Sequence, residues 1–224
     1  MPKNHSKNYH DYVFRNGQLV GKFDEMYKYS EKIPWLQDKD KDKIEQKITL
    51  DILADDQPFD TIIDIGCGLG YFLNQLKKKA TRRGQLFGYD ISKTAVKKAG
   101  KLFPSFKFKE LNFSENPNTF VKKWDQKTSG KTLYAIRGVV WYVFHKMNNI
   151  VTNLNYAIKK DQYLLISQNF PPKRTNFIGK EIIPNPQKLL SFFTKSFKPV
   201  FINYLQDPKS KNLDNWFTVL LVKK

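Results

Sequence analysis

A short apolar segment that ends in alternating glycines constrains the fold of this chain more than any other feature. Residues 61–65 are mostly apolar, and the loop from Asp64 to Gly70 reads Asp-Ile-Gly-Cys-Gly-Leu-Gly. Glycine tolerates positive φ angles and close backbone approach, because it has no Cβ atom. Residues 71–80 have the pattern of a helix. A strand, a glycine turn and a helix in this order predict a ligand-binding crossover of an α/β protein.

Strands and helices are expected to alternate along the rest of the chain. Further strands are predicted at 85–90, 106–111, 132–136, 162–167, 199–205 and 216–222, and further helices at 92–103, 118–127, 147–159 and 185–194. Such alternation implies a parallel sheet that helices cover on both faces. We therefore expect a three-layer α/β sandwich with a mostly parallel seven-stranded sheet, whose last strand is antiparallel.

The first 56 residues lack this alternation. Residues 1–35 are polar and aromatic without a clean period, which suggests an arm that packs on the domain through its rings. Residues 39–54 are expected to form a helix with Ile44, Ile48 and Leu53 near one face. The apolar run from Val139 to Phe144 has the length of a strand or a loop.

The net charge of +18 raises the question of a nucleic-acid partner, because lysine and arginine neutralise phosphates. Specific recognition tends to use the arginine fork. Arginine is scarce here, and it occurs at Arg15, Arg82, Arg83, Arg137 and Arg174. A general bias toward lysine explains the charge more simply, and nucleic-acid binding stays an alternative.

The remaining composition narrows the class of protein. The single cysteine, Cys67, excludes an intramolecular disulfide and a cysteine-clustered zinc site, and no metal is expected. No segment approaches the roughly 18 apolar residues of a membrane span. No apolar stretch follows the basic amino terminus, as a secretory signal would require. We expect a cytoplasmic protein, and the sequence leaves its oligomeric state open.

Polar residues follow two further predicted strands. Asp90 lies 20 residues beyond Gly70 and can accept hydrogen bonds from both hydroxyls of a ribose. Ile91 can lie against an adenine face, and the Asn112 amide can meet the adenine edge. The turn itself is expected to hold a ligand carboxylate by its backbone alone, and Asp64 to orient the turn or to accept a hydrogen bond from an ammonium group.

The glycine spacing separates two cofactor classes. Nicotinamide binders use Gly-x-Gly-x-x-Gly, whose third glycine falls here at position 71, and that residue is Tyr71. The pattern Asp-x-Gly-x-Gly-x-Gly, with the acid at residue 90, resembles class I methyltransferases that use S-adenosylmethionine (SAM). The resemblance covers about residues 60–170.

This resemblance implies roles for particular residues. Asp64, Gly66, Cys67 and Gly68 correspond to the loop that binds the methionine moiety, and Asp90 with Ile91 to the ribose and adenine contacts. Asn112 and Phe113 fall where the family often has an Asp followed by a small or apolar residue. Arg137 belongs to the fourth-strand motif beside the methionine, and Trp35 of the arm is a candidate lid over the cofactor. The positions so implied are these: Asp64, Gly66, Cys67, Gly68, Asp90, Ile91, Asn112, Phe113, Arg137 and Trp35.

The resemblance also bears on the acceptor. The Asn-Pro-Pro-Tyr signature, typical of nucleobase or glutamine amide methylation, does not follow the fourth strand. Met26-Tyr27 and Ile33-Pro34-Trp35 resemble the closing arm of small-molecule members, including those that methylate sugar amines. We expect transfer to N or O of a small molecule such as an amino sugar. His145 and Tyr142 are the candidate catalytic residues, and the sequence leaves open whether a base is needed.

The resemblance predicts two parts for the chain: an arm and helix that cover the cofactor site (1–56), and a SAM-binding methyltransferase domain (57–224). An RNA or protein methyltransferase is the main alternative. A nucleotide-binding oxidoreductase and a non-catalytic SAM sensor are the others.

Overall fold

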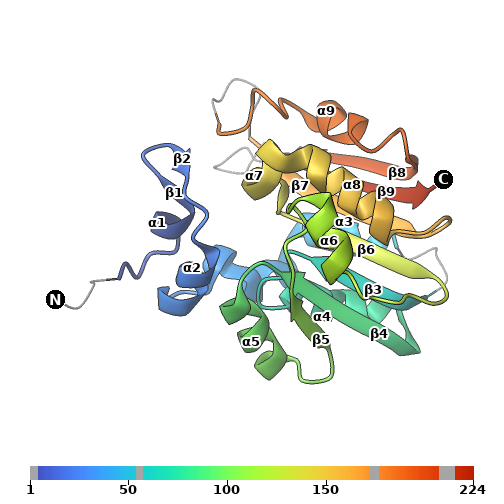
Figure 1. Ribbon diagram of the computed structural model, residues 1–224, viewed down its shortest axis with the longest axis horizontal. Coiled ribbons are helices and arrows are strands. Elements are labelled where there is room, and N and C mark those ends of the chain that lie inside the picture. Colours follow the sequence, from blue (N-terminus) through green and yellow to red (C-terminus); the bar gives the residue numbers. More distant parts are fainter. Residues whose placement is uncertain (1–4, 54–57, 172–176, 207–214) are drawn as a thin grey trace.

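The computed structural model describes residues 5–53, 58–171, 177–206 and 215–224. Its centre is a seven-stranded sheet in the order β5-β4-β3-β6-β7-β9-β8 (Figure 1). The strands are β3 (Phe59–Ile65), β4 (Ala80–Asp90), β5 (Lys107–Glu110), β6 (Thr132–Arg137), β7 (Tyr163–Phe170), β8 (Phe197–Gln206) and β9 (Asn215–Lys223).

Only β9 is antiparallel within this sheet. It pairs antiparallel with β7 on one side and with β8 on the other, while the pairs among β3 to β7 are parallel. The predicted fold class is therefore confirmed, including the antiparallel last strand. The crossover direction reverses between β3 and β6, which is where open α/β sheets bind ligands.

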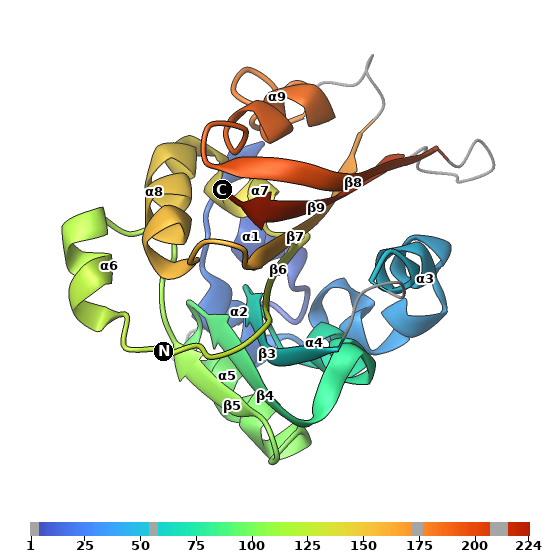
Figure 2. The ribbon, with the colours of Figure 1, turned by 90° about the vertical axis from the view of Figure 1, so that its right-hand side faces the viewer.

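Helices cover both faces of the sheet (Figure 2). One face packs against α6 (Pro117–Lys123), α8 (Met147–Ala157) and α9 (Pro186–Ser191), through residues such as Phe120, Leu154 and Leu189. The other carries α3 (Ile44–Asp51), α4 (Tyr71–Leu76) with the short η2 (Lys77–Lys79), and α5 (Lys93–Leu102). The two faces have separate apolar cores, so the strands between them are buried on both sides.

Local capping explains where several helices begin. The Ser92 hydroxyl accepts a hydrogen bond of 3.0 Å from the Ala95 N–H and caps α5. Asn116 and Asn185 cap α6 and α9, and each is followed by a proline in the first turn. The beginnings predicted for these three helices are close to the observed ones.

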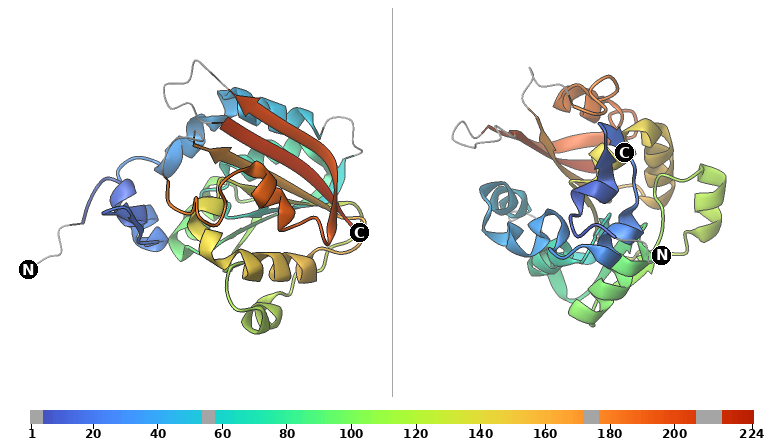
Figure 3. Two further views of the ribbon diagram at one scale, coloured as in Figure 1. Left: turned by 90° about the horizontal axis from the view of Figure 1, so that it is seen from above. Right: turned by 90° about the vertical axis from the view of Figure 1, so that its left-hand side faces the viewer.

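The amino-terminal arm has structure that the sequence did not predict. It contains α1 (His10–Val13), a two-stranded hairpin of β1 (Phe14–Arg15) and β2 (Gln18–Leu19), α2 (Phe23–Tyr29) and η1 (Pro34–Asp42). These elements lie beside the carboxyl edge of the parallel strands, in front of the sheet in the right-hand view of Figure 3. The predicted boundary between residues 56 and 57 lies outside the described residues.

Two local expectations were wrong. The run from Val139 to Phe144 is neither a strand nor a loop: it forms α7 (Val140–Val143) and enters η3 (Phe144–Lys146), because β6 has already ended at Arg137.

Helix α3 begins at Ile44 rather than at residue 39, and Ile44 itself is 57% exposed. This helix buries Glu45, Gln46 and Thr49 instead.

Candidate functional site

A large cleft lies between the carboxyl edge of the sheet and the amino-terminal arm. Its volume is about 1020 Å³, at the upper end of the roughly 300–1,000 Å³ typical of small-molecule sites. From the sheet side it is lined by Gly66, Asp90, Ile91, Asn112, Phe113, Arg137 and Val139, and from the arm by Tyr9, Phe14, Phe23, Tyr27, Trp35 and Gln37. The glycine turn and Asp90 thus border one space, as the sequence pattern predicts.

The glycine turn is tightly packed. Gly66 and Gly68 have φ angles of 74° and 53°, in the left-handed region that favours glycine. A Cβ atom on Gly66 would lie 2.4 Å from a methyl group of Val139, and one on Gly68 would lie 2.5 Å from the Gln37 amide and the Tyr27 hydroxyl. The positive φ angle disfavours any larger residue at both positions, and a Cβ atom would also require Val139 to move at Gly66 and the ends of Gln37 and Tyr27 to move at Gly68.

The backbone N–H groups of this turn all have partners within the protein. Those of Gly66 and Cys67 donate to the Tyr89 carbonyl, and that of Gly70 donates to the Cys67 carbonyl. The remaining two bond to side chains: Gly68 N–H to Asp90 Oδ2 at 2.9 Å, and Leu69 N–H to Gln37 Oε1 at 3.1 Å.

The expectation that the backbone of the turn alone holds a ligand carboxylate is therefore wrong for this structure. Four of the five donors in residues 66–70 serve to fix the turn against β4, against itself or against Asp90. The fifth contacts Gln37, a side chain from the arm that the sequence reasoning missed. A ligand carboxylate at this turn would therefore need donors from the surrounding side chains.

Asp90 lies at the end of β4 with both carboxylate oxygens oriented by backbone donors. Oδ2 accepts from Gly68 and Oδ1 accepts from the Ser92 N–H at 2.8 Å. Burial raises the pKa of Asp90 to about 6, although hydrogen bonds from Ser92, Gly68 and Ile91 lower it. An ionised carboxylate has about four acceptor positions, so Asp90 retains acceptor capacity beyond these three backbone donors.

Asp64, at the end of β3, is 2% exposed and points into the protein beside the turn. Burial and then the charge of Asp90 raise its pKa to about 7, against the lowering effects of Arg137 and of the Leu73 N–H. Its Oδ2 atom has no hydrogen-bond partner among the described residues. A buried acceptor of this kind fits a ligand ammonium group.

Arg137 ends β6 and lies between two helices and a strand. A guanidinium nitrogen is 3.8 Å from Glu45 Oε1 of α3, and the guanidinium carbon is 4.9 Å from the centre of the Trp216 ring. Arg137 therefore provides a positive charge on the methionine side of the predicted site.

The other predicted residues are distributed as follows. Ile91 is half-exposed at the cleft, where a flat apolar ring can lie against it. Asn112 uses its Oδ1 atom to accept hydrogen bonds from the Ser114 N–H and hydroxyl. Phe113 is buried among Tyr89, Phe120 and Trp124, and it also borders the cleft. Cys67 is buried and borders a second, smaller cavity.

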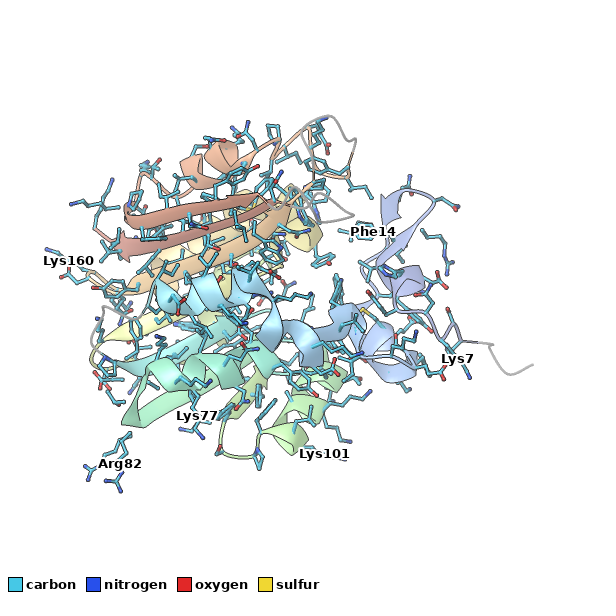
Figure 4. The ribbon with its side chains drawn as sticks, turned by 180° about the vertical axis from the view of Figure 1, so that it is seen from behind. Lys7, Phe14, Lys77, Arg82, Lys101 and Lys160 are labelled. Atoms are coloured by element: carbon cyan, nitrogen blue, oxygen red, sulfur yellow. The ribbon has the colours of Figure 1, made fainter. Side chains whose placement is uncertain are left out.

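Aromatic rings form the end of the cleft that faces the arm. The Tyr142 ring of α7 contacts Trp35, Phe23 and Phe14, with centroid distances of 5.3, 5.4 and 6.1 Å. Figure 4 shows Phe14 directed from the arm toward the body of the molecule. Trp35 thus packs against Tyr142, one of the two candidate catalytic residues.

The two candidate catalytic residues differ in environment. Burial raises the pKa of Tyr142 well above its usual range, so its hydroxyl is protonated at neutral pH and serves as a donor rather than a base. His145 is exposed at the rim of the cleft. Among the described residues no group of three or more His, Cys, Asp or Glu side chains is arranged to hold a metal ion.

Comparison with known proteins identifies the family. A family model for the methyltransferase domain matches residues 56–171, more than half of the chain. The chain belongs to this family. It is a class I SAM-dependent methyltransferase, and the cofactor is SAM. A search of curated protein sequences finds no match.

Solved structures with this fold include other methyltransferases. The N-methyltransferase NodS from Bradyrhizobium japonicum WM9, in complex with S-adenosyl-L-homocysteine (SAH), is 13% identical with a TM-score of 0.62, over 85% of this chain and 92% of that one. A SAM-dependent methyltransferase from Aquifex aeolicus is 14% identical with a TM-score of 0.60, over 84% and 95%. A TehB-like enzyme from Corynebacterium glutamicum is 17% identical with a TM-score of 0.54, over 80% and 88%.

The residues of the methyltransferase fit this cofactor. Asp90 has acceptor capacity beside the cleft, and Asp64 has an unpartnered buried oxygen beside the glycine turn. No described helix is long and apolar enough to cross a membrane.

Proposed function

We propose that this methyltransferase acts on N or O of a small molecule, such as an amino sugar or a related metabolite, held between the sheet edge and the arm. The observation that carries the proposal is the arm itself. Phe14, Phe23 and Trp35 of the arm line the cleft and contact Tyr142 of α7, so aromatic side chains close the end of the cleft that faces the arm. Such a pocket suits a molecule of limited size better than a polymer.

In this proposal the cofactor-binding residues keep the roles that the sequence suggests. Asp90 accepts hydrogen bonds from the ribose hydroxyls, while Ile91, Asn112 and Phe113 border the adenine. Asp64 binds the methionine ammonium, and Gly66, Cys67 and Gly68 form the turn beside it.

Arg137 supplies positive charge to the methionine side, and Trp35 covers the cleft from the arm. Residues 1–56 form the cover and residues 57–224 the SAM-binding domain.

When bound, SAM supplies an activated methyl group on a sulfonium. The protein's main contribution is then to orient the acceptor, which can contribute up to roughly 7–11 kcal/mol. An acceptor N or O forms its bond to the methyl carbon as the carbon–sulfur bond breaks, and the acceptor's proton then leaves. His145 is the candidate group to receive that proton, and the Tyr142 hydroxyl is a candidate donor that positions the acceptor.

The charges around the cleft favour an uncharged nucleophile. Asp90 is the only carboxylate among the described residues that line it, whereas Lys43 and Lys146 lie at its border. An amine surrounded by rings and positive charges loses its proton more readily than in water. The neutral amine is the form with a free electron pair, so this lining supports an amine acceptor.

A labelling experiment tests the class of acceptor. The purified protein is incubated with SAM labelled in the methyl group and with a cell extract, which is then separated into small molecules, RNA and protein. We expect label in the small-molecule fraction, with no label when Asp90→Asn protein is used. Label in RNA or protein overturns the proposal in favour of a macromolecular acceptor, the alternative that the charge of +18 suggested.

The distribution of charge supports this expectation. Figure 4 labels Lys77, Arg82, Lys101 and Lys160, whose side chains extend from the outer surface of the body, away from Phe14 and the arm. Basic residues at these positions do not line the cleft.

A further inference from the structure

A second, much smaller cavity lies directly behind the glycine turn. Its volume is about 50 Å³, and a cavity of roughly 10–15 Å³ already holds a water molecule. It shares Gln37, Gly66 and Arg137 with the large cleft, so the two spaces adjoin. Its remaining lining residues are Gln46, Asp64, Cys67, Phe72 and Gln75. The space has room for a small polar group that enters from the cleft.

Two buried polar side chains around this cavity have atoms without a partner among the described residues. Gln46 of α3 is 0% exposed, and neither the nitrogen nor the oxygen of its amide has a hydrogen-bond partner among the described residues. Asp64 Oδ2 is also buried and has no hydrogen-bond partner among the described residues. Buried polar side chains nearly always have partners, because an unpaired one is costly. Two such groups on one small cavity indicate a polar ligand.

The chemistry of the lining indicates which ligand. Asp64 offers a negative charge, Arg137 a positive charge, and Gln46 an amide that can donate or accept. An α-amino acid head group has the same combination, with an ammonium and a carboxylate on one carbon. The N–H groups of the turn are already engaged, so side chains have to bind this head group.

We propose that Gln46, together with Arg137, binds the α-carboxylate of the methionine part of SAM in this cavity, while Asp64 binds its ammonium. Gln46 lies outside residues 56–171 and so belongs to no part of the chain that the family model matches. Helix α3 therefore confers specificity for the amino-acid end of the cofactor. The inference depends on SAM as cofactor and is independent of the acceptor.

Three ligands separate the contributions of the two groups. SAM has both the carboxylate and the ammonium, decarboxylated SAM has only the amine, and 5′-methylthioadenosine has neither. Each is titrated calorimetrically into the full-length protein and into Gln46→Leu, Asp64→Asn and Thr49→Val variants. Thr49 is the matched control, because it is buried on the same helix and lines neither cavity. Gln46→Leu removes an unpartnered amide, so its unfolding midpoint should not fall.

Gln46→Leu should weaken SAM binding by about 10- to 100-fold, the usual range for one hydrogen bond to a charged group. Its affinities for decarboxylated SAM and methylthioadenosine should stay within about twofold of the unmodified protein's, well below the loss for one such bond. Asp64→Asn should weaken both SAM and decarboxylated SAM and spare methylthioadenosine, and Thr49→Val should change none of the three.

Two results overturn the inference. Unchanged SAM binding by Gln46→Leu would mean that the cavity holds only water, and an equal loss for all three ligands would place the effect elsewhere than at the carboxylate. Since no acceptor is present, neither result bears on the small-molecule proposal. Failure of the unmodified protein to bind any of the three would instead refute the cofactor assignment on which both depend.

Discussion

Asp64 and Asp90 are two buried carboxyl groups whose charges oppose each other in the ligand-free protein. The carboxyl pKa values are raised from 3.8 to about 7 for Asp64 and to about 6 for Asp90, first by burial. Between about pH 4 and pH 7 the folded state therefore holds more protons than the unfolded state. Stability from these groups falls as the pH rises through that window. In the proposed function both groups are ionised when the ligand binds.

Substitution of Asp64 by Asn should therefore stabilise the ligand-free protein in a pH-dependent manner. Below about pH 4 the Asp64 carboxyl is protonated in both the folded and the unfolded state and resembles the amide, so the two unfolding midpoints should lie closest there and separate progressively between about pH 4 and pH 7. At pH 8 the wild-type carboxylate is ionised, and the variant should melt at a higher temperature. Thermal melts at several pH values measure this difference. A difference that is the same at pH 5 and pH 8 would show that the Asp64 charge is not the cause.

Some site residues were predictable from the sequence and others were not. Gly66, Gly68 and Asp90 follow strands directly, so strand prediction alone places them at one edge of the sheet. Gln37 reaches the turn from the arm through a hydrogen bond to Leu69, 32 residues along the chain, and Gln46 of α3 lines the small cavity beside the turn. No local pattern distinguishes them from solvated glutamines, because their burial depends on tertiary packing.

At the scale of single elements, apolar periodicity did not predict which side of helix α3 is buried. Ile44, Ile48 and Leu53 suggested an apolar buried face, and Leu53 is indeed buried. Ile44 is exposed, while Thr49 is buried and its hydroxyl lies 3.4 Å from that of Ser167 on β7. The polar side of this helix faces the cofactor site and the sheet. Polar contacts with the sheet, and the cofactor role that we propose for Gln46, account for the departure from the hydrophobic pattern.

The carboxylate of Asp24 links helix α2 to the body of the protein. Asp24 Oδ1 accepts hydrogen bonds from the Ser92 hydroxyl at 2.9 Å and from the Thr94 N–H at 2.7 Å, at the beginning of α5. The same Ser92 donates its own N–H to Asp90. Asp24 therefore connects the arm to the residue predicted to bind the ribose.

Replacement of Asp24 by Ala should loosen the arm without unfolding the sheet. A net loss of about 1 kcal/mol is expected for these partly solvated bonds, so the arm amides should exchange with solvent roughly five- to tenfold faster. Hydrogen exchange of residues 10–29 measures this change, with β6 and β7 as internal references. Glu25→Ala is the control, because Glu25 only pairs with Lys22 at 3.5 Å on the exposed side of α2. Equal acceleration in both variants would contradict a specific attachment through Asp24.

At the scale of the whole molecule, the arm and the sheet together make the cleft. A buried cluster joins Tyr12, Val13 and Met26 of the arm to Leu69 of the glycine turn and Ala95 of α5. The alternation of strands and helices over residues 60–167 predicted the sheet and its layers. The elements of the arm were not predicted, because short helices and a two-stranded hairpin gain stability mainly by packing against a larger body.

The central claim is that the turn at residues 64–70 and Asp90 border one binding site for the cofactor. A crystal structure of the protein with SAH measures this most directly. We predict the ribose hydroxyls within hydrogen-bonding distance of Asp90, the adenine against Ile91, and the amino-acid end beside Asp64 and Gln46. A complex in which SAH occupies another part of the surface, with the cleft empty, would contradict the claim.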